Sequence, residues 1–101
     1  MIKKAISIEP DNGYFVDSLG WAYYQSGQLD EALQELKKAV ELLKKDGEDD
    51  TVVREHLGDV YYKKGDLEEA KKQWEISLSL DSAREEVKKK LERLEGALRG
   101  K

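Results

Sequence analysis

An internal repeat is the sequence feature that most constrains how this chain can fold. The stretch SLGWAYYQSGQLDEAL, which begins at Ser18, returns as HLGDVYYKKGDLEEAK, which begins at His56, after an offset of 38 residues. Repeats with a period of about 20–50 residues are typical of arrays in which each unit buries its apolar side against its neighbour. We therefore expect a stack of similar units.

Each copy contains two helical patterns separated by a short break around a glycine, Gly27 in the first copy and Gly65 in the second. A glycine just beyond the last periodic residue is typical of a helix C-terminus, and the acidic residues that follow favour the positive end of the next helix dipole. Between the copies, Asp50 is expected to cap the helix that begins at Thr51. The sequence predicts helices over residues 13–26, 29–45, 51–64, 67–80 and 83–98.

Two further glycines, Gly20 and Gly58, occupy the same position inside the first helix of each copy. A glycine in a helix interior costs about 1 kcal/mol relative to alanine. We expect each glycine to let the paired helices approach closely, with Ala32 and Ala70 serving the same purpose on the facing helices. Tighter packing then offsets the cost.

The segment 83–98 carries one apolar stripe and is charged on its other faces. The stripe consists of Val87, Leu91, Leu94 and Leu98. Such a pattern is typical of the helix that ends a repeat stack. Ion pairs within the helix are expected at i, i+4, among them Glu86–Lys90. The basic residues expected on the solvent-exposed face are Lys88, Lys89, Lys90 and Arg93.

Composition excludes several classes of protein. A net charge of −4 and a pI near 5.1 argue against a surface for nucleic acid or anionic membranes. No apolar run approaches the roughly 20 residues of a membrane span, and the N-terminus lacks the pattern of a signal peptide. A cytoplasmic location is therefore the default expectation, although the compartment is not determined. With no cysteine there is no disulfide and no thiolate metal site.

The repeated residues resemble those of tetratricopeptide repeats, whose period is about 34 residues. The matching positions are Leu19, Gly20, Tyr23, Gly27, Ala32, Leu36 and Ala39, and again Leu57, Gly58, Tyr61, Gly65, Ala70, Trp74 and Ser77. The resemblance implies an all-α fold, a right-handed helical-repeat solenoid of antiparallel helix pairs. It divides the chain into the end of a preceding repeat (1–12), repeat 1 with an extended loop (13–50), repeat 2 (51–82) and a C-terminal capping helix (83–101).

The chain departs from the family pattern in three ways. The early tryptophan position holds Val16 and Arg54, so we expect less apolar bulk at the start of each first helix. The period is 38 residues, which indicates an extra helical turn or a longer loop before Thr51. The opening half-repeat lacks its partner helix, so Ile2 and Ile6 are expected to leave apolar surface through which the chain could form a homo-oligomer.

A second stripe on the first helices is not explained by packing within a pair. It consists of Tyr14, Asp17, Trp21 and Tyr24, with Val52, Glu55, Asp59 and Tyr62 at the same positions of repeat 2. In the family that the chain resembles, such positions line a concave groove that holds a peptide or a partner's helix. Aromatic rings beside carboxylates offer apolar contact and attract basic side chains. The candidate contact residues are Tyr14, Asp17, Trp21, Tyr24, Glu55, Asp59 and Tyr62.

Two alternatives remain open for this stripe. Trp21 and Tyr24 could instead fill the contact between neighbouring first helices. Some family members hold a C-terminal carboxylate with a clamp of Lys, Asn and Arg, and none of these residue types stands at the equivalent positions, so recognition of that kind is not expected here. Those positions are Asp17, Trp21, Val52, His56 and Asp59.

No residues are arranged for chemistry. His56 is the only histidine and has no nucleophile or second ligand beside it, so we expect a surface or groove histidine. The acidic loop Asp46–Asp50 lacks the ligand spacing of a calcium loop, and a solvated turn is expected. The sequence therefore predicts no enzymatic activity, no metal and no cofactor. It favours a module that binds a protein or peptide with basic or apolar side chains, or alternatively a structural spacer or self-association segment of a longer array.

Overall fold

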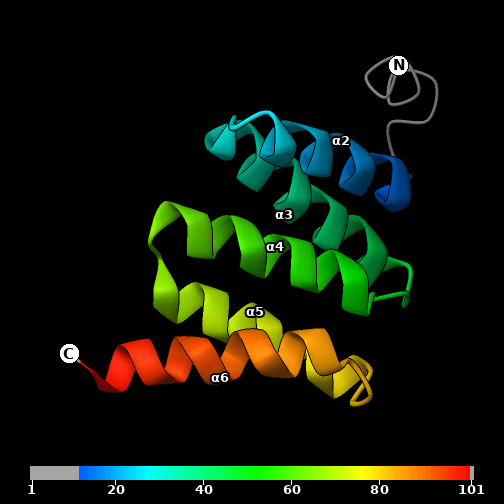
Figure 1. Ribbon diagram of the computed structural model, residues 1–101. Helices are drawn as coiled ribbons and strands as arrows, with labels where there is room; N and C mark the ends of the chain where they lie inside the picture. Colours follow the sequence, from blue (N-terminus) through cyan, green and yellow to red (C-terminus); the bar gives the residue numbers. More distant parts are fainter. Residues whose placement is uncertain (1–11, 101) are drawn as a thin grey trace.

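The computed structural model describes residues 12–100, and within this range the chain forms helices and no strands (Figure 1). The helices are α2 (Gly13–Gln25), α3 (Leu29–Lys45), α4 (Thr51–Lys64), α5 (Leu67–Leu80) and α6 (Glu85–Arg99). The five predicted helices are therefore present, and α6 begins two residues later than expected. Residues 1–11 of the opening half-repeat, which include Ile2 and Ile6, lie outside the described residues.

The helix ends follow from single residues at the boundaries. Asn12 and Asp50 cap α2 and α4, and the Asp50 carboxylate accepts hydrogen bonds from the backbone N–H groups of Val52 and Val53 at 2.8 and 3.0 Å. At the other end of these helices, Gly27 and Gly65 have φ values of 82° and 89°. This left-handed conformation, which glycine adopts without a steric penalty, reverses the chain within a few residues.

The tight reversals make α2–α3 and α4–α5 antiparallel pairs, and α6 packs against α5. In Figure 1, α2, α4 and α6 follow one another down the molecule, with α3 and α5 behind them. The architecture is an all-α helical-repeat fold. Because every second helix lies on the same side, α2, α4 and α6 together present one continuous face.

The structure explains the long period of the first repeat. Helix α3 has 17 residues, whereas its counterpart α5 has 14. The extra length of repeat 1 is thus mostly one additional turn of α3, and only a small part is loop. From the start of α4 at Thr51 to the start of α6 at Glu85, the spacing returns to 34 residues, the period of the family that the sequence resembles.

The interior glycines allow the close approach that the sequence predicts. A Cβ atom on Gly20 would lie 2.7 Å from Cγ of Leu36, and one on Gly58 would lie 2.4 Å from Cδ1 and Nε1 of Trp74. Both distances are far below van der Waals contact. The large side chains of the second helices, Leu36 and Trp74, therefore lie directly on the backbone of the first helices.

The apolar core consists of two clusters, one on each side of repeat 2. The first joins α2, α3 and α4 and contains Val16, Ala32, Leu36, Ala39, Val40, Leu43, Val53, Leu57 and Val60. The second joins α5 and α6 and contains Ala70, Trp74, Val87, Leu91 and Leu94. Tyr61 packs against both clusters, and Leu98 packs against the second. The apolar stripe of α6 is therefore docked, as the sequence predicts.

Arg54 was expected only to reduce the apolar bulk at the start of α4, but it also makes polar contacts. Its side chain is buried, and its guanidinium donates to both carboxylate oxygens of Asp49 and to Oε1 of Gln73, all at 2.8 Å. The hydrogen bond from Arg54 holds the pKa of Asp49 below its usual range, and burial acts in the opposite direction. Part of the acidic loop thus ties α4 and α5 together instead of being only a solvated turn.

Alanine substitutions at three glycines test the close approach. We expect Gly20→Ala and Gly58→Ala each to lower the free energy of unfolding by about 1–3 kcal/mol, because the added methyl group overpacks a tight contact. The matched control is Gly96→Ala in α6, where an added Cβ has no neighbour within 4 Å. This control should gain up to about 1 kcal/mol from helix propensity. Urea unfolding measures all three, and stabilisation by Gly58→Ala would contradict the packing.

Candidate functional site

The stripe predicted to contact a partner lies on α2 and α4, and two of its residues, Glu55 and Asp59, contact Lys90 of α6. Tyr14 and Tyr62 are each 48% exposed, and Val52 is 38% exposed. The half-buried members are Asp17, Trp21, Tyr24 and Asp59. Glu55 is only 5% exposed. The stripe is therefore uneven, with aromatic surface open to solvent and its carboxylates largely enclosed.

Three rings form a continuous stack from α2 to α4, which we call the aromatic stack: Tyr24, Trp21 and His56. The Trp21 ring lies 4.7 Å from the Tyr24 ring with an interplanar angle of 14°, and 4.0 Å from the His56 ring at 19°. Nδ1 of His56 is 2.9 Å from Oδ1 of Asp17, a contact that orients the imidazole. Trp21 thus touches both helices but does not belong to either core cluster.

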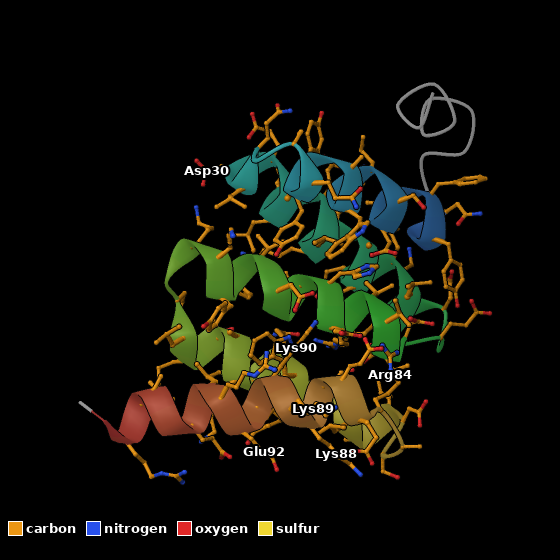
Figure 2. The ribbon with its side chains drawn as sticks, in the orientation of Figure 1. Asp30, Arg84, Lys88, Lys89, Lys90 and Glu92 are labelled. Carbon is orange, nitrogen blue, oxygen red and sulfur yellow. The ribbon has the colours of Figure 1, made fainter. Side chains whose placement is uncertain are left out.

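The other two carboxylates of the stripe are bound by cations from the C-terminal part of the chain. Lys90 Nζ lies 2.7 Å from Oε2 of Glu55 and 2.9 and 3.1 Å from the two oxygens of Asp59. Arg84, just before α6, donates to Oε1 of Glu55. Figure 2 shows Lys90 projecting from α6 toward α4, whereas Lys88 and Glu92 lie on the opposite side of α6.

The Asp17–His56 and Glu55–Lys90 contacts are the same contact in successive repeats. Glu55 stands 38 residues after Asp17, and Lys90 stands 34 residues after His56, which are the two helix-start spacings of the stack. In each case, a carboxylate on one first helix meets a basic or imidazole side chain on the next. These pairs therefore join neighbouring repeats across the face.

Burial and charge act against each other in this network. Burial by itself would lower the pKa of Lys90, but the hydrogen bonds to Glu55 and Asp59 outweigh it and raise the pKa above its usual value. Burial raises the pKa of Asp59, and the hydrogen bond from Lys90 opposes that effect. Lys90 is thus charged at neutral pH and compensates the enclosed carboxylates.

This network corrects two expectations from the sequence. Lys90 was expected on the solvent-exposed face and in an i, i+4 pair with Glu86, but it is half-buried and reaches α4. The face was expected to be acidic, but Glu55 and Asp59 are already paired. The attraction within a pair shielded from water is stronger than within an exposed pair, although desolvation of the two groups offsets much of it.

A pocket of about 230 Å³ opens beside the aromatic stack. Its lining consists of Tyr24, Asp59, Tyr62, Trp74, Lys90 and Arg93. The Trp74 indole N–H contacts the Glu55 carbonyl oxygen at 3.3 Å and Oδ1 of Asp59 at 3.2 Å, and the Tyr62 ring lies 5.6 Å from the Trp74 ring. The pocket therefore combines three aromatic rings with a balanced ion pair and one further cation.

Sequence reasoning missed the contributions of Trp74, Arg84, Lys90 and Arg93 to this face. The sequence identified Trp74 only as a position that matches the family pattern, whereas its indole N–H also reaches Asp59. The signal that could have found Lys90 and Arg93 is the 34-residue spacing, which makes α6 a third first helix and places Lys90 at the position of His56.

No group of three His, Cys, Asp or Glu side chains within residues 12–100 is placed to bind a metal ion. Over the same range, none of the helices combines the length and apolar character needed to cross a membrane. The face of α2, α4 and α6 therefore carries stacked rings and charges that are paired within the chain.

The fold and this face define an α-helical repeat protein. The family model described as tetratricopeptide repeat matches residues 16–46 and, in a second variant, residues 53–84. The chain therefore belongs to the tetratricopeptide repeat family. No curated protein matches the sequence significantly.

Solved structures agree with this assignment. The first tetratricopeptide repeat domain of Spaghetti (RPAP3), bound to the HSP90 peptide SRMEEVD, is 25% identical with a TM-score of 0.87, covering 96% of this chain and 74% of that chain. The N-terminal domain of stress-induced protein-1 from C. elegans is 28% identical with a TM-score of 0.78, covering 93% and 76%.

Two alanine variants test whether Trp21 belongs to a surface or to the core. Leu19 is 8% exposed, and Leu19→Ala should lower the free energy of unfolding by roughly 2–5 kcal/mol. Trp21→Ala removes two ring contacts, worth about 0.5–1.5 kcal/mol each in addition to the area that they bury. Because Trp21 is half-buried and lies outside both core clusters, this variant should cost less than Leu19→Ala. Thermal melts compare the two variants. Equal losses would show that Trp21 is a core residue, which is the alternative that the sequence leaves open.

Proposed function

We propose that the face formed by α2, α4 and α6 binds a peptide segment or a helix of another protein. The observation that carries this proposal is the aromatic stack, together with the exposed rings of Tyr14 and Tyr62 on the same side of the molecule. Charged residues make up 40% of the chain, so aromatic surface concentrated on one face stands out. Aromatic side chains are enriched at the centres of protein interfaces.

Membership of the tetratricopeptide repeat family supports the general role, because repeats of this family form protein-interaction modules. The domain of Spaghetti (RPAP3), which is bound to a short peptide, supports a peptide as the class of partner. Its ligand is not carried over to this chain. The clamp positions on α2 and α4 hold Asp17, Trp21, Val52, His56 and Asp59 and no Lys, Arg or Asn.

The geometry favours apolar over basic side chains in the partner. Glu55 and Asp59 already bind Lys90, so these two carboxylates have little attraction left for a partner's cation. One oxygen of Asp17 is occupied by its contact with His56. The exposed rings remain available for contact. In the proposed mode, a partner gains affinity mainly by covering Trp21, Tyr24 and Tyr62, and the pairs beneath hold these rings in position.

Selection from a random peptide library tests the proposal, because it requires no known partner. We expect selected peptides to bind the wild-type protein and to lose about 2 kcal/mol, roughly 30-fold in affinity, with Trp21→Ala. The matched control is Lys37→Ala, an exposed position on α3, which should bind as the wild type does. Undiminished binding by Trp21→Ala would place the contact elsewhere. A chain that selects no peptide and instead self-associates in ultracentrifugation would favour the structural-spacer alternative.

A further inference from the structure

The pocket beside the aromatic stack differs in chemistry from the rest of the face. Its volume of about 230 Å³ is below the roughly 300–1,000 Å³ of sites for whole small molecules, so it is suited to a single side chain. Tyr24, Tyr62 and Trp74 supply aromatic surface from α2, α4 and α5. An uncharged side chain that entered here would meet rings contributed by three helices.

The charges around this pocket are already balanced from within the chain. Lys90 contacts Glu55 and Asp59 at 2.7–3.1 Å, and Arg84 also binds Glu55, so two carboxylates face two cations. Arg93 adds one more positive charge to the lining. Lys90 Nζ also lies 5.9 Å from the centre of the Trp74 ring, the ring surface on which a partner's cation would otherwise sit.

We propose that this pocket receives one uncharged apolar or aromatic side chain of a bound peptide, and that Lys90 determines this specificity by excluding basic side chains. The inference rests on the function proposed above and adds the residue that sets the charge preference. Lys90 acts as an internal substitute for the cation that Glu55, Asp59 and Trp74 would otherwise attract.

The exclusion has a direct electrostatic cause. A lysine or arginine of the partner would be desolvated beside Lys90 and Arg93 and would find both carboxylates occupied. Burying a charge without a free partner is costly, and like charges placed close together across an interface weaken binding. An apolar side chain meets none of these costs and gains contact with Tyr24 and Tyr62.

The first junction of the stack offers a natural comparison. There the position equivalent to Lys90 is His56, and the position equivalent to Asp59 is Trp21. The first junction therefore has the stacked rings of Trp21 and His56 where the second has the ion pair of Asp59 and Lys90. The charge-based selection is therefore particular to the pocket next to α6. Lys90 is the one cation that contacts both carboxylates, so a single substitution of Lys90 can test the selection.

Two short blocked peptides with the same central Leu-Trp-Leu and either glutamine or lysine flanks serve as the probes. The Trp74 indole N–H, held by Glu55 and Asp59, reports on the pocket in NMR titrations, and the Trp21 indole N–H reports on the stack. We expect the wild-type protein to bind the glutamine peptide at least about tenfold more tightly than the lysine peptide. In Lys90→Met, this preference should disappear or reverse.

Two more variants complete the design. Lys89→Met is the matched control, because Lys89 is exposed on the same helix and should keep the wild-type preference. Lys90→Gln retains a hydrogen-bond donor, so it should lose the preference even if Lys90→Met does not fold. A preference unchanged in Lys90→Gln and Lys90→Met, or equal binding of both peptides by the wild type, overturns the role of Lys90 and leaves the binding face intact. If neither peptide moves either indole signal in any variant, the proposed function fails, and this inference fails with it.

Discussion

The contact between the Trp74 indole and the backbone at Gly58 supports both the core and the candidate site. Only the hydrogen on the glycine Cα leaves room for the ring, since a Cβ would lie 2.4 Å from two of its atoms. Trp74 belongs to the cluster that docks α6, and its N–H reaches Asp59, which binds Lys90. The close pairing of α4 with α5 thus fixes where α6 lies and how the pocket is charged.

The stack of repeats depends on polar pairs as well as on apolar clusters. Asp17 with His56 and Glu55 with Lys90 join successive first helices in the same register. Because these pairs occupy the carboxylates of the face, the surface that remains for the proposed partner is mainly aromatic. A network of this kind contributes modestly to stability, since desolvation offsets much of the attraction, but it specifies how the helices align.

The sequence predicted those features of the fold that depend on residues close together in the chain. Glycine breaks, the Asp50 cap and the stripe of α6 each depend on residues within a few positions, so the helices and their ends followed from the spacing. The same reasoning assigned Lys90 to a pair with Glu86, four residues away. Its actual partners are Glu55 and Asp59, more than thirty residues earlier, and only packing brings them together. The aromatic positions of the face were predicted, whereas its charge state was not.

A double-mutant cycle between Gly58→Ala and Trp74→Ala tests most directly whether this contact governs the fold. Urea unfolding of the wild type, both single variants and the double variant gives the coupling free energy. If the ring and the added methyl compete for one space, removing the ring relieves most of the cost of Gly58→Ala, and the double variant should be at least about 1 kcal/mol more stable than the sum of the single effects predicts. Effects that add within about 0.5 kcal/mol would show that the two residues act independently, and would contradict the account.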